Sequence, residues 1–587
     1  MDYNLGKVGD QSAQKKSSYA ALKKLISFMD EERKRLVVAL IAILINSTLS
    51  LLSPILVARA IDQFVQTRQY HGILVYAGIL ATMYLLALGT SYMQTKLMGG
   101  VGQRMLFSLR NAVFHKLQEL PVAFFNQNKA GDLISRVNND TDKLNQFFSQ
   151  SLMQFVGSIF VMTGAGIFLL FLNLPLGAAA LAPALFLWIF TKIISPWVKK
   201  KNAANLKSVG NMSAEIQESL QNFKVIIAFN RRDYFRAKFE EANQKNYSSA
   251  IGAGLANNVF TPVYGLSSNI GQLVVLAFGI YLISIGHFTI GFLIGFLSYI
   301  NNFYGPLRQL ATLWANFQVA MAGWDRISQI LTLHSNLNTV HAGANGAPHS
   351  FLEFKDVHFS YPNGKEVLHN NSFSLDRGKT YAFVGPTGGG KTTTAYLMAR
   401  LYDPTKGHVY FDGKDIRSYD SAERSKKIGF ILQEPFLFTG TIRENILYGN
   451  EEYLSHSNEE IEKVFADAGL VALLARFESG LDTKVVSGGE SISLGQKQLV
   501  AFMRAVLRKP DLLILDEATA NIDTITEQLL EDIIKKLPAT TTRVIIAHRL
   551  NTIENADEIF FVNSGQVIRA GSLQNAMNLL MHDKRAS

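Results

Sequence analysis

A glycine-rich stretch in the second half of the sequence has the residue types and spacing of a phosphate-binding loop. It follows the pattern G-x-x-x-x-G-K-[ST], after an apolar run readable as a strand and before a run readable as a helix. Successive glycines let backbone N–H groups turn toward phosphates, and a helix start adds the positive end of its dipole. Lys391 would neutralise the β- and γ-phosphates of a nucleotide, and the Thr392 hydroxyl would hold Mg²⁺. The nucleotide-binding residues predicted here are Gly385, Pro386, Thr387, Gly388, Gly389, Gly390, Lys391, Thr392 and Thr393.

Two later runs also end in residues suited to phosphate chemistry. Leu512 begins an apolar, strand-like run that leads into Asp516 and Glu517. Asp516 would hold the Mg²⁺ shell, and Glu517 would polarise the attacking water as a general base. A second buried-strand pattern begins at Val544 and leads to His548, which is placed to reach a γ-phosphate. A lone histidine is usually structural, but this setting favours a functional one.

Composition divides the chain into a membrane part and a soluble part. A chain of 587 residues is too long for one hydrophobic core. Hydrophobic residues make up 48% and charged residues only 18%, and the deficit of charge lies in the first half. The net charge of +10 comes from Lys and Arg beside long apolar runs, which indicates membrane topology rather than nucleic-acid binding. The absence of cysteine excludes disulfides and thiolate metal sites.

The first half contains six apolar runs long enough to cross a bilayer. The segments before the first run, between the second and third, between the fourth and fifth, and after the sixth are basic, so both termini should be cytoplasmic. Residues 1–17 are polar and predicted to be flexible, and residues 18–35 have the pattern of an interfacial helix. The predicted spans are 36–56, 73–93, the two halves of 151–191 divided at Asn173-Leu174-Pro175, 258–285 and 289–317.

Taken in this order, the motifs resemble those of the ATP-binding-cassette family, and of its exporters in particular. The resemblance covers essentially the whole chain, which looks like a half-transporter. It implies an all-α six-span transmembrane domain in residues 1–335, a linker in 336–350 and an α/β P-loop ATP-binding cassette in 351–587. It also implies ATP and Mg²⁺ as cofactors, a second half-transporter as partner, and a multi-pass position in the bacterial plasma membrane.

The resemblance assigns further roles to individual residues. Tyr361 resembles the aromatic on which adenine stacks, although a surface tyrosine is the simpler alternative. Gln433 resembles the glutamine that touches Mg²⁺ and water, so Thr392, Gln433 and Asp516 form the expected metal set. Glu517, His548 and Gln433 form the expected catalytic set, with His548 as the switch histidine. The loop that crosses to the opposite cassette corresponds to Ala520, Asn521, Ile522 and Asp523.

One motif departs from the family pattern. The signature, usually Leu-Ser-Gly-Gly-Gln, caps ATP held by the other cassette. A leucine at its third position should crowd that contact, because glycine there allows close backbone approach. We therefore expect a heterodimer whose other subunit has an intact signature and degenerate catalytic residues, with a homodimer that tolerates the leucine as the alternative. The signature residues here are Ile492, Ser493, Leu494, Gly495 and Gln496.

The substrate is the least constrained part of the prediction. No charged residue interrupts 151–191, so a cavity built partly from it would suit lipophilic or amphipathic compounds, as in multidrug efflux. Lipid flipping, peptide export and an ATP-gated channel or regulatory subunit remain alternatives. Two cytoplasmic turns, near 121–129 and near 219–228, should couple ATP use to transport. Candidate cavity residues, which otherwise pack between helices, are Phe260, Tyr264, Tyr299 and Phe303.

Overall fold

The computed structural model describes residues 3–5, 32–335, 337, 339–340, 350–362, 364–486, 491–516, 524–546, 553 and 555–583. The chain divides into two compact units. One contains residues 1–8, 118–130 and 333–587, and the other contains residues 9–117 and 131–332. Most of the predicted linker 336–350 and most of the interfacial helix predicted in 18–35 lie outside the described residues, so those boundaries stay predictions.

The membrane unit consists of long helices that continue beyond the predicted spans. Five described helices are long and apolar enough to cross a membrane. Helix α13, which contains the predicted sixth span 289–317, is not among these five, so that span stays a prediction; it is 42 residues long and packs against α3, α8 and α12. The long helices are α3 (Arg33–Ala60), α4 (Tyr70–Gln118), α8 (Leu152–Leu172), α9 (Leu174–Gln221), α11 (Arg232–Asn258), α12 (Phe260–Ser284) and α13 (Ile290–Leu331).

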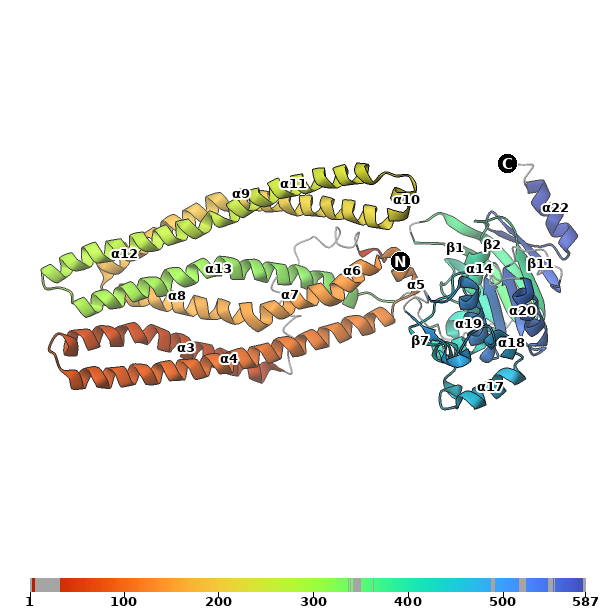
Figure 1. Cartoon of the computed structure of the whole chain (residues 1–587), viewed down its shortest axis with the longest axis horizontal. Helices are drawn as coiled ribbons and strands as arrows, with labels where there is room; N and C mark the ends of the chain where they lie inside the picture. The colour runs from red at the N-terminus through yellow and green to blue at the C-terminus, as the bar shows by residue number, and fades with distance from the viewer. Residues whose placement is uncertain are drawn as a thin grey trace. The chain divides into compact units, whose positions relative to one another are not determined.

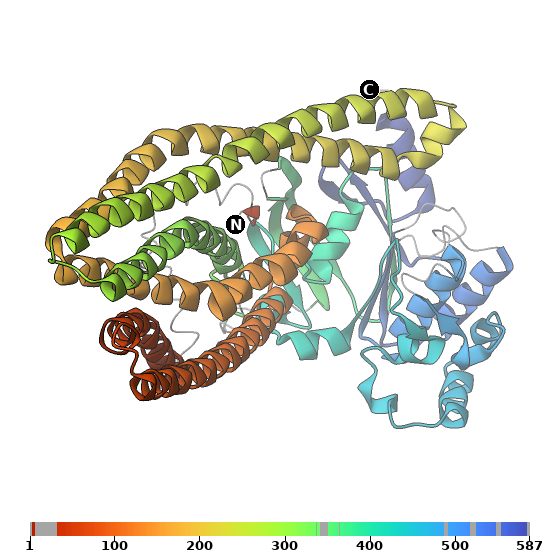
Figure 2. The ribbon, with the colours of Figure 1, turned by 60° about the vertical axis from the view of Figure 1, so that its left-hand side comes forward.

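Short helical pieces join the long ones. A π-helical turn, η2 (Ile61–Val65), follows α3, and α10 (Phe223–Ala228) lies between α9 and α11. Helices α9 and α11 pack together and lie side by side in both views (Figures 1 and 2). The remaining pieces are α6 (Ala130–Ser135), η3 (Arg136–Asp140), α7 (Thr141–Gln146) and η4 (Phe147–Ser151).

The predicted break between the third and fourth spans is confirmed. Helix α8 ends at Leu172, and Asn173 leaves the helical conformation with φ −156° and ψ 107°. The Asn173 side chain accepts a hydrogen bond from the N–H of Leu176 at 3.0 Å. Pro175 lacks an N–H and lies in the first turn, where the helix needs none. Asn173 and Pro175 together therefore end one span and start the next.

Aromatic side chains fill the interior of the bundle. Tyr299 is fully buried and stacks on Phe168, with ring centroids 5.4 Å apart. Tyr264 is also buried, and Phe260 and Phe303 pack against the same apolar cluster. These aromatics therefore pack between helices, which was the alternative to lining a cavity.

A charged network joins α6 and η3 to the end of α13. Arg136 is 5% exposed and donates to Asp132 at 2.9 Å and to the carbonyl of Arg326 at 2.6 Å. Arg326 in turn pairs with Asp132 at 2.5 Å and with the fully buried Asp140 at 3.1 Å. Because each buried charge faces an opposite one, the network avoids the cost of an isolated buried ion.

The cassette unit contains a parallel sheet and an antiparallel sheet (Figure 1). The six-stranded sheet has the order β12-β11-β3-β10-β9-β6; strands β11, β3, β10, β9 and β6 are parallel, and the edge strand β12 is antiparallel to β11. The four-stranded antiparallel sheet has the order β2-β1-β4-β5. Its strands are β1 (Leu352–Ser360), β2 (Glu366–Leu375), β4 (Lys406–Phe411) and β5 (Lys414–Asp415); the larger sheet has β3 (Thr380–Val384), β6 (Ile428–Ile431), β9 (Leu512–Asp516), β10 (Thr542–Ile546), β11 (Glu558–Asn563) and β12 (Gln566–Arg569).

Helices surround these sheets, and a short strand pair closes one side. The pair is β7 (Gly440–Thr441) with β8 (Lys484–Val485). Helices α16 and α19 pack against each other over one apolar core that also includes strands β6 and β9. The helices are α14 (Lys391–Met398), α15 (Ser421–Lys427), α16 (Ile442–Leu447), α17 (Asn458–Asp467), α18 (Val471–Leu474), α19 (Leu494–Leu507), α20 (Thr524–Lys536) and α22 (Leu573–Asp583).

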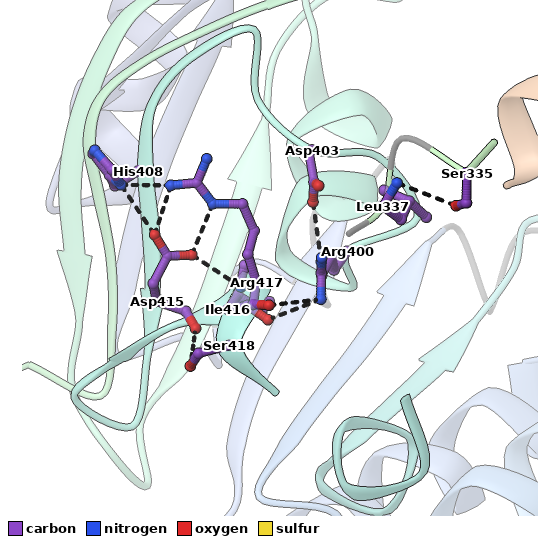
Figure 3. A network of polar contacts seen from close by, with 9 residues as sticks. All are labelled: Ser335, Leu337, Arg400, Asp403, His408, Asp415, Ile416, Arg417 and Ser418. Atoms are coloured by element: carbon purple, nitrogen blue, oxygen red, sulfur yellow. Dashed lines mark hydrogen bonds and ion pairs between the residues drawn. The ribbon is translucent and has the colours of Figure 1, made fainter. Parts of the chain in front are cut away.

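A polar network at the antiparallel sheet anchors the chain that leads into the cassette (Figure 3). The carbonyl of Arg417 accepts from the N–H of Val340 at 3.0 Å and from the buried Arg400 at 3.2 Å. The Arg417 guanidinium also pairs with Asp415 at 2.7 Å, and Asp415 lies 3.0 Å from Nδ1 of His408. Burial raises the pKa of Asp415, but hydrogen bonds from Arg417 and His408 outweigh it and lower the pKa to about 2.

We predict that Arg136→Met destabilises the membrane unit far more than Arg110→Met. The first change removes a buried guanidinium that pairs with the half-exposed Asp132 and hydrogen-bonds the Arg326 carbonyl and Gln329, and the loss of these contacts should cost about 3 kcal/mol. Arg110 pairs with Asp142 at 3.0 Å on the surface, so its loss should cost less than about 1 kcal/mol. Denaturant titration of each purified variant in detergent measures both losses. Equal losses would show that the Arg136 network contributes no more than a surface pair.

Candidate functional site

Three parallel strands bring the predicted phosphate-binding and catalytic segments to one edge of a sheet. Strand β10 lies between β3 and β9, and Ile546 pairs in register with Phe383 on one side and with Asp516 on the other. The carboxyl ends of the three strands are therefore level. Ligands of open α/β sheets bind at such an edge. Glu517 follows β9 by one residue and His548 follows β10 by two, but both lie outside the described residues.

The phosphate-binding loop fits only because its glycines lack side chains. A Cβ at Gly385 would lie 2.0 Å from the carbonyl oxygen of Val562, and a Cβ at Gly389 would lie 2.6 Å from the same atom. Gly390 has φ 115° and immediately precedes α14, a conformation that other residues rarely adopt. The loop thus runs against strand β11 and delivers its backbone N–H groups to the start of α14.

Lys391, Thr392 and Asp516 lie together beside this loop. The Lys391 ammonium group donates to the carbonyls of Gly385 at 2.8 Å and Pro386 at 3.0 Å, so the charge stays over the loop. The Thr392 hydroxyl donates to Asp516 at 3.3 Å, and Asp516 is 1% exposed. The sequence therefore predicted the association of two residues that are 124 positions apart.

This oxygen pair suits Mg²⁺ bound together with phosphates. Mg²⁺ prefers oxygen ligands and often takes only one or two from protein when a substrate phosphate is present. Thr392 and Asp516 offer a hydroxyl and a carboxylate at one point. Among the described residues, there is no cluster of three or more His, Cys, Asp or Glu side chains that could hold a metal without such help.

Tyr361, which follows strand β1 of the antiparallel sheet, contacts the first turn of α14. Its hydroxyl lies 3.0 Å from the hydroxyl of Thr393, and its ring meets Tyr402 edge to face with centroids 5.3 Å apart. Burial raises the pKa of Tyr361, so the phenol stays neutral. Tyr402 also accepts a hydrogen bond from Asn126 at 2.8 Å. The sequence analysis did not single out Tyr402. Its position just after α14, the helix that follows the phosphate loop, is the only feature of the sequence that could have indicated it.

The signature residues begin helix α19. Ser493 is the N-cap residue, and its hydroxyl accepts from the N–H of Gln496 at 3.2 Å while the Gln496 side chain accepts from the N–H of Ser493 at 3.1 Å. Ile492 is buried in the cassette core. Leu494 is the first residue of α19 and is 41% exposed. The helix accommodates leucine here, and its side chain lies on the surface beside the first turn.

The other predicted site residues are only partly placed. Gln433 is exposed and follows the end of β6, the strand next to β9, by two residues. The loop predicted to cross to the other cassette, residues 520–523, lies outside the described residues. The turn near 121–129 forms helix α5 (Val122–Gln127), which belongs to the compact unit of the cassette. The structure thus places the phosphate loop, Asp516, Tyr361, Gln433 and the signature.

Two family models match the chain in the order that the motifs predict. The ABC transporter transmembrane region matches residues 36–307, and the ABC transporter model matches residues 368–520. A solved structure of a bacterial Atm1-family ABC exporter with ATP bound has the same fold, with a TM-score of 0.77. It is 24% identical, and the similarity covers 94% of this chain and 96% of that one.

Curated relatives align along most of their length. A fatty acid ABC transporter ATP-binding/permease protein of Mycobacterium bovis is 32% identical, over 84% of this chain and 77% of its own. A multidrug resistance ABC transporter ATP-binding and permease protein of Lactococcus lactis subsp. lactis is 30% identical, over 84% of this chain and 83% of its own. The chain therefore belongs to the ABC transporter family, as an exporter half-transporter whose ATPase domain follows its membrane domain.

Proposed function

We propose that this chain is the catalytic half of a heterodimeric exporter that uses ATP hydrolysis to move lipophilic or amphipathic compounds across the bacterial plasma membrane. Two more general statements follow from family membership alone: the chain is an ATPase coupled to transport, and ABC exporters work as dimers. The identity of the partner, the class of substrate and the roles of the site residues belong to the proposal.

The nucleotide site is proposed to work by positioning and charge. The loop N–H groups and Lys391 would hold the β- and γ-phosphates, and adenine would stack on Tyr361. Thr392, Asp516 and Gln433 would hold Mg²⁺, which supplies positive charge against the phosphates when bound. Glu517 would orient and deprotonate the attacking water, and His548 would donate to the γ-phosphate. The hydrogen bond between Thr392 and Asp516 supports this arrangement most directly.

The exposed Leu494 is the main observation in favour of a heterodimer. In the family arrangement, the signature faces ATP held by the other cassette. A leucine side chain on the surface beside the first helical turn would hold that phosphate away from the N–H groups. In a homodimer, both sites would have this defect. In a heterodimer, an ordinary signature from the partner would close the site built on Lys391 and Glu517.

An apolar cavity in the membrane unit supports a lipophilic substrate. It lies between α3 and α8 and has a volume of about 520 Å³. Its lining is apolar except for the hydroxyls of Thr48 and Thr163, so it offers few partners to a charged solute. The relative named as a fatty acid transporter favours lipid export as a second candidate beside drug efflux.

We place both termini in the cytoplasm from the positions of basic residues.

We predict that Glu517→Gln keeps ATP binding and lowers ATP turnover by about a hundredfold or more, because a general base contributes at least that much. ATP hydrolysis and nucleotide binding are measured on the purified transporter with its partner. Glu451→Gln, at an exposed glutamate of the same unit, serves as the control and should leave both unchanged. Unchanged turnover in Glu517→Gln would remove Glu517 from the role of base.

We predict that the chain purified alone hydrolyses ATP slowly and that Leu494→Gly raises its turnover about tenfold or more. Glycine would let each signature approach the ATP of the other copy, and a gain of about 1.4 kcal/mol in the transition state gives this factor. Leu494→Ile keeps the bulk and should give no increase. Robust substrate-stimulated hydrolysis by the unmodified chain alone would contradict the heterodimer.

A further inference from the structure

Three residues near the start of the chain occupy a built pocket on the cassette unit. Tyr3 is fully buried and Leu5 is 2% exposed, although this part of the sequence is predicted to be a flexible polar tail. That prediction is wrong for Tyr3–Leu5, which we call the strap. The strap and its contacts, residues 124–128 and 334, all belong to one compact unit.

Two side-chain amides hold the backbone of the strap. The Asn128 amide donates to the carbonyl of Tyr3 at 2.9 Å and accepts from the N–H of Leu5 at 3.0 Å. The Gln127 side chain accepts from the N–H of Tyr3 at 3.0 Å. Three backbone polar groups of the strap are thus paired by two neighbouring residues of the α5 turn. Backbone hydrogen bonds of this kind give affinity in peptide recognition, and side-chain pockets give specificity.

The side chain of Tyr3 makes the contacts that give the pocket its specificity for tyrosine. Its ring meets Phe124 edge to face, with centroids 6.3 Å apart and planes at 89°. Its hydroxyl donates to the carbonyl of His334 at 3.1 Å. A buried tyrosine needs a partner for its hydroxyl, and His334 provides it. The pocket therefore distinguishes tyrosine from phenylalanine by one hydrogen bond, and from alanine by the whole ring.

The strap joins the two stretches through which the chain passes between its compact units. Those stretches are residues 118–130, which contain α5, and the residues around 333. The strap contacts α5 through Phe124, Gln127 and Asn128, and the second stretch through His334. On the same turn, Asn126 donates to Tyr402 at 2.8 Å, and the Tyr402 ring contacts Tyr361. The strap thus fixes a turn that also touches the aromatic residues beside the phosphate loop.

We propose that residues 124–128 and His334 form a tyrosine-specific docking site for the chain's own strap, and that docking holds α5 in the position where Asn126 meets Tyr402. The docking itself rests on the contacts above. Its consequence, tighter coupling between ATP hydrolysis and transport, rests on the proposed function. The strap acts through α5, so the role of its residues is to position that helix.

The docking site is tested with a labelled peptide of residues 1–8 and full-length chain that lacks residues 2–5. The peptide should bind the deletion variant at least about tenfold more tightly than the unmodified chain, whose own strap competes at high effective concentration. The same peptide with Tyr3→Ala should not bind. Equal binding to both proteins, or no binding to the deletion variant, would overturn the proposal. If the deletion variant does not fold, Tyr3→Ala in the full chain replaces it.

The coupling consequence is tested separately, by the ratio of substrate transported to ATP hydrolysed in proteoliposomes containing the partner. Tyr3→Ala should lower this ratio severalfold, Tyr3→Phe should lower it less, and added peptide should restore it in the deletion variant. An unchanged ratio together with intact peptide binding would overturn the coupling role and leave the docking site. A strap that binds only between two chains, shown by cross-linking of Tyr3 variants to the other subunit, would overturn docking within one chain.

Discussion

The close approach of the phosphate loop to strand β11 is the constraint on which the rest of the site depends. The carbonyl of Val562 occupies the space that a side chain at 385 or 389 would need. Glycine at these positions lets β3 pass into α14 without displacing β11. The alignment of β3, β10 and β9 then places Asp516 beside Thr392. A side chain at either glycine would move the loop away from this alignment, so the chemistry depends on a packing requirement.

The sequence predicted the parts of this site that rest on local pattern. Glycine spacing, the Lys-Thr pair and the apolar run before Asp516 are short-range signals, and parallel strand ends meet at one edge by topology. Apolar run length likewise predicted the five spans found among the described helices, and Asn173 with Pro175 predicted the break between two of them. The helical spacing of apolar residues after Lys96 also predicted that this helix would continue beyond the bilayer, and α4 does so for 25 residues beyond the predicted span. Its end at Gln118 was less predictable, because polar helical turns carry no marker of where a helix stops.

Contacts between distant segments could not be predicted in the same way. Tyr402 meets Asn126 across 276 positions, and Tyr3 meets His334 across 331. Neither pair has a periodic pattern, and both depend on a single side chain that finds a partner in the folded unit. A polar composition predicted a flexible tail at the strap, but composition averages over a segment, whereas burial here depends on Tyr3, Leu5 and the amides that pair their backbone.

Leu494 departs from the usual glycine of the signature, and this departure can have an effect only where two cassettes meet. It lies in the first turn of α19 with helical geometry, where leucine is a good helix former, and Ser493 still caps the helix. Folding of the chain therefore has no reason to exclude leucine. A penalty arises only when a phosphate must approach the N–H groups beside it, and in the family arrangement that phosphate belongs to the other cassette. Under the proposed heterodimer, the residue is neutral for the folding of this subunit and matters only at the site that it shares with its partner.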